Sequence, residues 1–377
     1  MPMLFTPLTL RGLTLRNRTV VSPMCQYSAQ HGLANEWHFA HLSRFALGGF
    51  GLVILEVTAV VPEGRISYAD LGLWDDSQIA PLKRIADFLH SQGTAAGIQI
   101  GHAGRKAATP VGWRGSFNET EEEKLRFAFE TWVPEAPSAI AHAGAPYQTP
   151  AAFDLDGIAR LKQAFVDATR RADAAGFDVI DIHAAHGYLL NQFLSPIANH
   201  RTDQYGGSRE NRMRLLLEII ELVREVWPAE KPIFTRLSVT DGRPDGWQVE
   251  DSVVLAAELK ARGVDLIDSS SGGFDGAGIA PAPLYQVPLS AAVRGGADMP
   301  TMAVGLITEA ADAETVLQKG EADLIALARG ALADPSWPIH ARLALGGEGD
   351  VYDLYPIQAR DRVRSMDRVL GRLLAAE

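Results

Sequence analysis

The chain has 377 residues, of which 47% are hydrophobic and 21% are charged, and its formal net charge is −11. This composition is typical of a soluble globular protein, and the length suits one large domain or two ordinary ones. The negative charge argues against nucleic acid as a partner, because a phosphate backbone selects a basic surface. Cys25 is the only cysteine, which excludes an intrachain disulfide and an iron–sulfur cluster held by the cysteines of one chain.

No apolar run in the sequence reaches the ~18 residues expected of a membrane span. Residues 1–6 do not combine a basic region with an apolar core, as a signal peptide does. We therefore expect no membrane partner and a reduced, cytoplasmic setting.

Eight short β-rich runs alternate with amphipathic helical patterns along the chain. Such alternation predicts parallel strands joined by crossover helices, and eight units predict one closed (β/α)8 TIM barrel, a single domain over residues 1–377. A doubly wound open sheet is the structural alternative. The expected strands are residues 19–24, 52–58, 95–102, 178–183, 232–238, 265–271, 300–305 and 323–329.

Capping residues and glycines mark the ends of several helices. Asp156 is expected to cap a helix over residues 157–175, and Ser208 a helix over residues 209–227. Two further helices are expected over residues 248–262 and 309–319, each ending at a glycine.

Three segments exceed a minimal barrel. Residues 5–17 alternate around Gly12 and predict a hairpin that plugs the bottom of the barrel. Residues 108–150, after the third strand, carry a charge run and several prolines, and we expect a lid or excursion over the mouth. Residues 346–377 form a C-terminal extension rich in arginine.

The period-two alternation of the strands predicts which side chains face the barrel interior. Gln99, Asp181 and His183 fall on inward faces, while the isoleucines beside them face the helices. Arg236 shares a face with Phe234. An inward arginine is costly without a strong partner, so a ligand or an acidic neighbour is required there.

The stretch from His183 through His186 to Tyr188 follows an apolar strand. Two imidazoles can hold a developing oxyanion, and a phenol beside them can deliver a proton, which suits the reduction of a polarised double bond. Two adjacent imidazolium ions would repel each other, so we expect at least one neutral ring. A structural histidine pair, or a metal site of a barrel hydrolase that uses His183, His186 and Asp181, remains the alternative on these residues alone.

Four long motifs, in order, resemble those of the Old Yellow Enzyme family, the FMN-dependent ene-reductases, in its bacterial thermophilic-like subclass. They are residues 22–27 (SPMCQY), 97–106 (GIQIGHAGRK), 183–188 (HAAHGY) and 201–212 (RTDQYGGSRENR). The resemblance extends from residue 4 to about residue 338. It implies an FMN enzyme reduced by NADPH or NADH, and it argues against a metal centre.

The resemblance also implies where FMN binds. Gln99 and Arg236 would reach the flavin ring from inside the barrel, and a permanent positive charge there stabilises the anionic reduced ring. The other residues that would line the ring or cradle the phosphate are Pro23, Met24, Cys25, Ala59, Gly305, Ala328, Arg329 and Gly330.

The resemblance implies that the substrate is an α,β-unsaturated carbonyl or nitro compound. It also implies that the protein is a homodimer or a homotetramer. His183 and His186 would hold its oxygen, FMN would supply hydride, and Tyr188 would protonate the α carbon. Tyr27 is similar to a second substrate-side tyrosine, and Lys106 to a family lysine near the mouth. Arg360 lies where the family tail would enter a neighbouring subunit's pocket, although about seventeen more residues follow it here; a solvated arginine in a basic helix is the alternative. Another FMN barrel, such as a dihydroorotate dehydrogenase relative, and a non-catalytic barrel are the remaining competitors.

Overall fold

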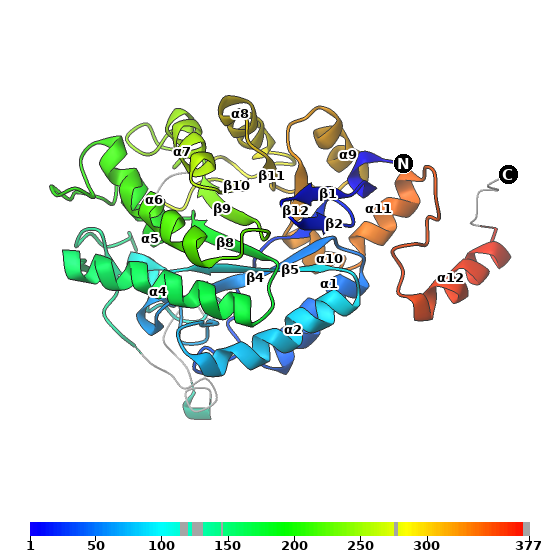
Figure 1. The fold of residues 1–377 in the computed structure, drawn as a ribbon, viewed down its shortest axis with the longest axis horizontal. Coiled ribbons are helices and arrows are strands. Elements are labelled where there is room, and N and C mark those ends of the chain that lie inside the picture. Colours follow the sequence, from blue (N-terminus) through cyan, green and yellow to red (C-terminus); the bar gives the residue numbers. More distant parts are fainter. Residues whose placement is uncertain (114–119, 123–130, 145, 275–277, 372–377) are drawn as a thin grey trace.

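The computed structural model describes residues 1–113, 120–122, 131–144, 146–274 and 278–371. Eight parallel strands close into a barrel in the order β10-β11-β12-β3-β4-β5-β8-β9, with helices packed around the outside (Figure 1). The first strand pairs with the last, Val20 lying opposite Ala326. The barrel prediction is therefore confirmed, and the open doubly wound sheet is wrong.

All eight expected strands are present, several of them shorter at their carboxyl ends. β3 stops at Val21, two residues before Pro23, which has no backbone N–H for a ladder. β12 stops before Ala328, where the chain turns into a short helix. The barrel strands are β3 (Thr19–Val21), β4 (Leu52–Ala59), β5 (Ala95–Gly101), β8 (Val179–Ala184), β9 (Ile233–Ser238), β10 (Leu266–Ser270), β11 (Thr301–Ala303) and β12 (Leu324–Leu327).

The helices between strands cover the outer face of the barrel. The longer helices are α1 (Glu36–Leu47), α2 (Ile79–Ser91), α4 (Leu155–Ala174), α6 (Arg209–Val226), α7 (Val249–Ala261), α8 (Val287–Ala297), α9 (Ala310–Gln318) and, after the last strand, α11 (Trp337–Leu345). Two short helices, α5 (Leu189–Leu194) and α10 (Arg329–Ala333), lie at the mouth. The chain also forms four 3-10 turns, η1 (Met3–Phe5), η2 (Pro62–Gly64), η3 (Asp76–Gln78) and η4 (Gly104–Lys106). Within the described ranges, no helix is long and apolar enough to span a bilayer.

Of the two predicted N-caps, the one at Ser208 is confirmed and the one at Asp156 is wrong. Ser208 caps α6 and its side chain accepts a hydrogen bond from the backbone N of Asn211. The cap of α4 is Asp154, whose Oδ1 accepts from Gly157 N at 2.6 Å, and not Asp156. Asp156 lies in the first turn of α4, where a negative side chain still favours the helix dipole.

Two apolar layers hold the barrel, and they follow the predicted alternation. The isoleucines Ile98, Ile100, Ile180 and Ile182 face the helices in the larger core. Inside the barrel, Val179 and Phe234 belong to a second, smaller core. This inner core occupies the amino-terminal half of the barrel, so the polar inward residues are left for the mouth.

A hairpin of β1 (Leu8–Leu10) and β2 (Leu13–Leu15) closes the bottom of the barrel, as predicted. Leu10 and Leu15 join the inner core, with Leu15 only 1% exposed. The plug therefore removes the lower ends of the barrel strands from water.

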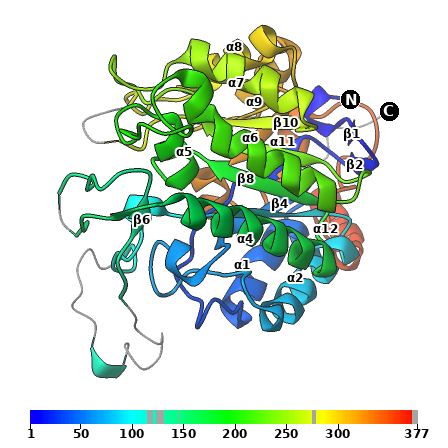
Figure 2. The same cartoon turned by 60° about the vertical axis from the view of Figure 1, so that its left-hand side comes forward.

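The excursion after β5 is described only in part, since residues 114–119, 123–130 and 145 lie outside the described ranges. β6 (Glu135–Ala136) pairs in parallel with β7 (Ala151–Ala152) just before α4. Trp132 Nε1 donates to Glu63 O at 2.8 Å, which ties this segment to the loop after β4. Figure 2 shows the segment extending beyond the ring of helices.

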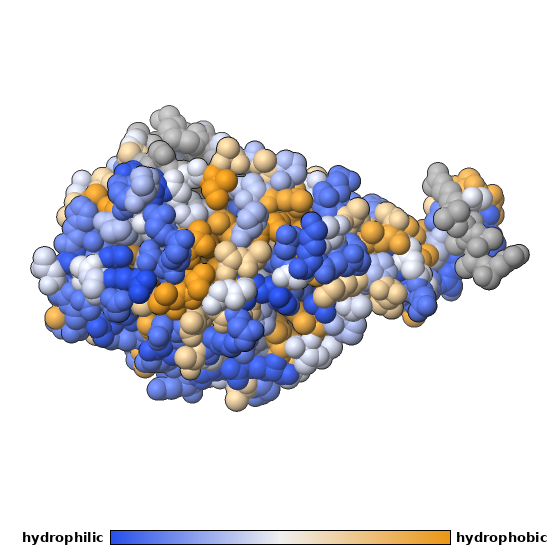
Figure 3. Space-filling model, turned by 90° about the horizontal axis from the view of Figure 1, so that it is seen from above, coloured by the Kyte–Doolittle hydropathy of each residue, from blue (hydrophilic) through white to orange (hydrophobic). Residues whose placement is uncertain are grey.

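The C-terminal extension carries a further helix, α12 (Ile357–Val369). Figures 1 and 3 show α12 standing away from the barrel at the end of a linker. Its apolar side chains remain outside the core, Ile357 being 78% and Val369 83% exposed.

We expect Leu15→Ala to lower the free energy of unfolding by about 2–5 kcal/mol, because it opens a cavity in the inner core. Thr14→Ala is the matched control, since Thr14 is exposed on the same strand. Urea denaturation of both variants measures the difference. Equal stability of the two variants would show that the hairpin does not contribute to the core.

Candidate active site

The paired histidines and the tyrosine lie together at the mouth of the barrel. His183 ends the inward face of β8, and Tyr188 stands at the start of α5. The ring of His183 is 5.2 Å from that of His186 and 5.1 Å from that of Tyr188, between centroids, and it meets both edge to face. Two donors and a phenol thus converge, as the sequence predicts.

A tight turn gives this cluster its shape. His186 and Gly187 both have left-handed backbone, with φ of 59° and 69°. A Cβ on residue 187 would lie 2.2 Å from Gly273 O, so only glycine allows the two loops to approach. Lys106 Nζ donates to His186 O and to Gly273 O, each at 2.8 Å. Lys106 therefore lies at the mouth, as expected, and it ties the two loops together.

His186 is oriented by residues that the sequence analysis did not select. Its backbone N donates to Ser238 Oγ at 2.8 Å, and its Nε2 lies 2.8 Å from Ser270 Oγ. Gln286 Nε2 donates to Ser270 Oγ at 3.2 Å. The run of three serines ending β10 was the available signal, because polar residues at a strand end face a barrel mouth.

Both imidazoles are neutral and the phenol is protonated at neutral pH. Burial lowers the pKa of His183 and of His186 well below the ordinary value, and the positive charges of Arg236 and Lys106 add to that effect. Burial raises the pKa of Tyr188 well above its ordinary value, and Cys25 and Asp70 contribute to the rise. The site therefore offers neutral hydrogen-bond donors rather than cations.

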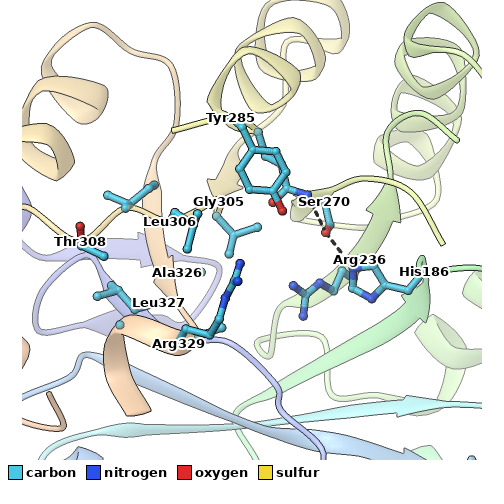
Figure 4. A pocket seen from close by; sticks show the side chains of 15 residues that line it. His186, Arg236, Ser270, Tyr285, Gly305, Leu306, Thr308, Ala326, Leu327 and Arg329 are labelled. Atoms are coloured by element: carbon cyan, nitrogen blue, oxygen red, sulfur yellow. Dashed lines mark hydrogen bonds between the residues drawn. The ribbon is translucent and has the colours of Figure 1, made fainter. Parts of the chain in front are cut away.

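A cavity runs from the histidines to the ends of β11 and β12. His186 and Arg236 line one end, and Gly305, Arg329 and Gly330 line the other, with Ala328 between the strand and α10. Figure 4 shows the side chains of Arg236 and Arg329 pointing into this space toward one another. Tyr285, which the sequence analysis also missed, lies over the same cavity.

Beneath the histidines, four inward side chains form what we call the floor cluster: Gln99, Asp181, Arg236 and Asp268. Gln99 Nε2 donates to Asp181 Oδ2 at 2.7 Å. Arg236 Nε forms an ion pair with Asp268 Oδ2 at 3.1 Å. The acidic partner that an inward arginine requires is thus Asp268, on the neighbouring strand β10.

The loop after β3 forms another wall of the mouth. Cys25, Tyr27 and Tyr188 are half-buried around a small apolar group with Ile66. Burial and nearby carboxylates raise the pKa of the Cys25 thiol, so it is protonated at neutral pH. Pro23 and Met24 precede it as a half-buried segment, and Ala59 lines a small hollow with Tyr188.

Arg360 is the one expected site residue that lies far from this mouth. It belongs to α12, which stands away from the barrel (Figure 1). Its Nη2 donates to Asp353 O at 2.6 Å and to Tyr355 O at 3.3 Å, which are contacts within the tail. In its own subunit, Arg360 therefore does not complete the pocket.

The geometry gives no support to the metal alternative. Asp181 accepts from Gln99 in the floor, while His186 Nε2 is engaged by Ser270 above it. Across the described ranges, no three side chains of histidine, cysteine, aspartate or glutamate come close enough to hold a metal ion.

The cavity fits FMN by the chemistry of its lining. Arg329 would supply the counter-charge that a phosphate dianion needs, and Gly305, with φ of 119° and no side chain, would let the backbone approach it. At the other end, Arg236 offers a fixed positive charge beside the paired histidines. An anionic ligand matches a cavity that two arginines line.

Known proteins bear this out. The family model described as the NADH:flavin oxidoreductase / NADH oxidase family matches residues 3–346. A protein of Geobacillus thermodenitrificans (strain NG80-2) named NADPH dehydrogenase is 47% identical over 346 residues, covering 91% of this chain and 94% of that protein.

Solved structures show the same relationship. Morphinone reductase is 29% identical with a TM-score of 0.74, covering 94% of this chain and 96% of that one. An old yellow enzyme homologue from Zymomonas mobilis is 26% identical with a TM-score of 0.74, again covering 94% and 96%.

The fold and the cavity thus define a flavin-dependent oxidoreductase built on a TIM barrel. The chain belongs to the NADH:flavin oxidoreductase / NADH oxidase family, the family of the Old Yellow Enzymes. It is an FMN-dependent enzyme that uses NAD(P)H, as the motifs predict. Family membership decides against the metal-dependent hydrolase and the non-catalytic barrel.

In histidine-selective ¹⁵N NMR spectra between about pH 5 and pH 8, we expect the rings of His183 and His186 to stay neutral, because burial and Arg236 lower their pKa values. His90 is the internal control, since its hydrogen bond to Asp178 raises its pKa. Single His183→Gln and His186→Gln variants assign the signals. Titration of either ring near its ordinary pKa would contradict the neutral site.

Proposed function

We propose that the protein is an NADPH-dependent ene-reductase that reduces the activated C=C bond of α,β-unsaturated aldehydes, ketones, imides or nitroalkenes. The observation that carries the proposal is the cluster of His183, His186 and Tyr188, whose member His186 lines a cavity together with Arg236 and Arg329. The name of the Geobacillus relative supports NADPH as the reductant.

In this proposal, Arg329, Gly305, Ala328 and Gly330 would hold the phosphate of FMN, and Arg236 and Gln99 would contact its ring. Pro23, Met24, Cys25 and Ala59 line the remaining ring edge. When bound, FMN takes hydride from the nicotinamide nucleotide and passes it to the β carbon of the substrate.

His183 and His186 hold the oxygen of the substrate. Two neutral N–H donors aimed at that oxygen stabilise the negative charge that develops on it, which can contribute several kcal/mol to the rate. Because both rings are neutral before the substrate arrives, neither repels the other or Arg236. The turn held by Lys106 and Gly273 keeps His186 in place beside His183.

Tyr188 delivers the proton to the α carbon. Its raised pKa keeps the phenol protonated, and it lies against His183, beside the bound substrate. Tyr27, from the opposite loop, contacts the far side of the substrate. Because one pocket serves the nucleotide and the substrate in turn, the kinetics should be ping-pong.

A second subunit completes the pocket in a homodimer or homotetramer. α12 stands away from its own barrel and carries Arg360 with it (Figure 1), so a neighbouring subunit can contact this part of the tail. Residues 347–377 lie beyond the part that the family model matches. The open hollow beside Cys25, Tyr27 and Trp113 is where we expect Arg360 of the neighbouring copy.

The reaction class is tested by the visible spectrum of the purified protein under anaerobic conditions. NADPH should bleach the yellow flavin absorption, and cyclohexenone should then restore it. A colourless protein that takes up no FMN, or one that cyclohexenone does not reoxidise, would overturn the proposal.

For Tyr188→Phe, we expect reoxidation by cyclohexenone to slow by about 10²–10⁴-fold, the usual contribution of a positioned acid. Reduction by NADPH needs no proton from Tyr188 and should change little. Stopped-flow absorbance separates the two steps. Tyr205→Phe is the control, because its hydroxyl bonds Glu218 away from the cavity; equal slowing of both steps in Tyr188→Phe would exclude the proton-donor role.

For Arg360→Ala, we expect weaker substrate binding, seen as a several-fold higher KM in the oligomer, with unchanged FMN content. Arg362→Ala, on the same helix and exposed, is the matched control. Steady-state kinetics with size-exclusion chromatography make the measurement. An unchanged KM in an intact oligomer would count against the shared pocket.

A further inference from the structure

The floor cluster contains one more carboxyl group than its positive charge can balance. Gln99, Asp181, Arg236 and Asp268 come from β5, β8, β9 and β10, which are neighbours in the barrel. Gln99 lies opposite Asp181, and Arg236 opposite Asp268. Between β8 and β9, Asp181 lies opposite Phe234 and Arg236 opposite His183, so the two pairs enter the barrel interior at successive levels on neighbouring strands.

Asp268 has a direct counter-ion and Asp181 has none. The guanidinium of Arg236 is 3.1 Å from Asp268, while Asp181 is bonded at one oxygen by the neutral amide of Gln99. Both aspartates are fully buried. The other oxygen of Asp181, Oδ1, has no hydrogen-bond partner within the described ranges, and neither oxygen of Asp268 has one; what separates the two carboxyl groups is the ion pair that Asp268 makes with Arg236. An unpaired buried carboxylate costs several kcal/mol, and a proton removes that cost.

Arg236 is the cation paired with the cluster. The other ionisable groups around it are the neutral rings of His183 and His186, Lys106, which donates to His186 O and Gly273 O at the mouth, and Arg329 from α10, which lines the same cavity as Arg236. β5 contributes Gln99, and the inward residues of β11 and β12 are the apolar Met302, Leu324 and Ala326.

We propose that Asp181 is a protonated carboxylic acid at neutral pH, and that its proton keeps the floor of the FMN site electrically neutral. The unpartnered Oδ1 is where the proton resides. With it, the floor carries one positive and one negative charge; without it, the floor is negative. Because reduction adds negative charge to the flavin ring, loss of this proton disfavours reduction.

Asp181 is then a positioning residue that acts through charge, and it does not touch the substrate. Burial and the negative charge of Asp268 both raise the pKa of Asp181, in keeping with this role. The inference rests on the proposed placement of the flavin ring above Arg236, but the protonation of Asp181 can be measured whether or not FMN is bound there.

Infrared spectroscopy tests the proton directly. Between about pH 5 and pH 10, the wild-type protein should lose the C=O band of a buried carboxylic acid at alkaline pH, and Asp181→Asn should lack that loss. Asp70→Asn is the matched control, because Asp70 is also buried with a pKa raised to about 7. This variant should lack a different loss of the C=O band, one that occurs at lower pH, and should keep the loss that belongs to Asp181. In Asp268→Asn, the band should disappear at lower pH, since Arg236 becomes the partner of Asp181.

Stability provides a second readout that needs no cofactor. The folded pKa of Asp181 lies above its unfolded value of 3.8, so its contribution is fully present below about pH 4 and is lost as the pH rises through the folded pKa. The wild type should therefore lose stability relative to Asp181→Asn as the pH rises from about 4, as measured by urea unfolding.

The reduction potential tests the link to FMN. The potential of the wild-type flavin should fall below that of Asp181→Asn at alkaline pH and match it at acidic pH, in spectroelectrochemical titrations. Identical infrared spectra of wild type and Asp181→Asn would overturn the protonation. If the infrared band is lost with pH but the flavin potentials of wild type and Asp181→Asn differ by the same amount at every pH, the proposed effect of the proton on the cofactor is wrong. Failure to bind FMN would instead refute the proposed function.

Discussion

Pairing of the first barrel strand with the last, β3 with β12, is the constraint on which the rest of the molecule depends. Closure brings the carboxyl ends of all eight strands to one mouth, although residues such as Cys25 and Arg329 lie about three hundred positions apart in sequence. It also forces every second side chain of each strand into a confined interior. The site is a consequence of that closure rather than of any local motif.

The same closure makes inward polar residues interdependent. The barrel interior is apolar from the plug up to Phe234, and polar from Gln99 and Asp181 upward. Arg236 can occupy the boundary only because Asp268 stands on the next strand. The ion pair in the floor cluster and the hydrogen-bond donors at the mouth therefore depend on the same closed ring of strands.

Much of this was predictable from the sequence, because period-two alternation and strand-end positions depend on local geometry. Those patterns identified the barrel, the plug and the inward direction of His183 and Arg236. The run of serines at the end of β10 indicated polar side chains at the mouth. It did not indicate which residues Ser270, Gln286 and Asp268 contact, because those contacts depend on strand neighbours that single-chain patterns do not reveal. The cap at Asp154 was missed because two aspartates compete within three residues, and backbone geometry decides between them.

The bottom plug has a consequence for how the family diversifies. Structural integrity resides in the leucine-rich end of the cylinder, at the greatest distance from the reacting groups. Mouth loops can therefore be exchanged, lengthened or reshaped with little risk of unfolding. The two solved structures that are 29% and 26% identical to this chain still match it over 94% of its length. Substrate specificity can therefore change through the mouth loops while the plugged end of the barrel stays the same.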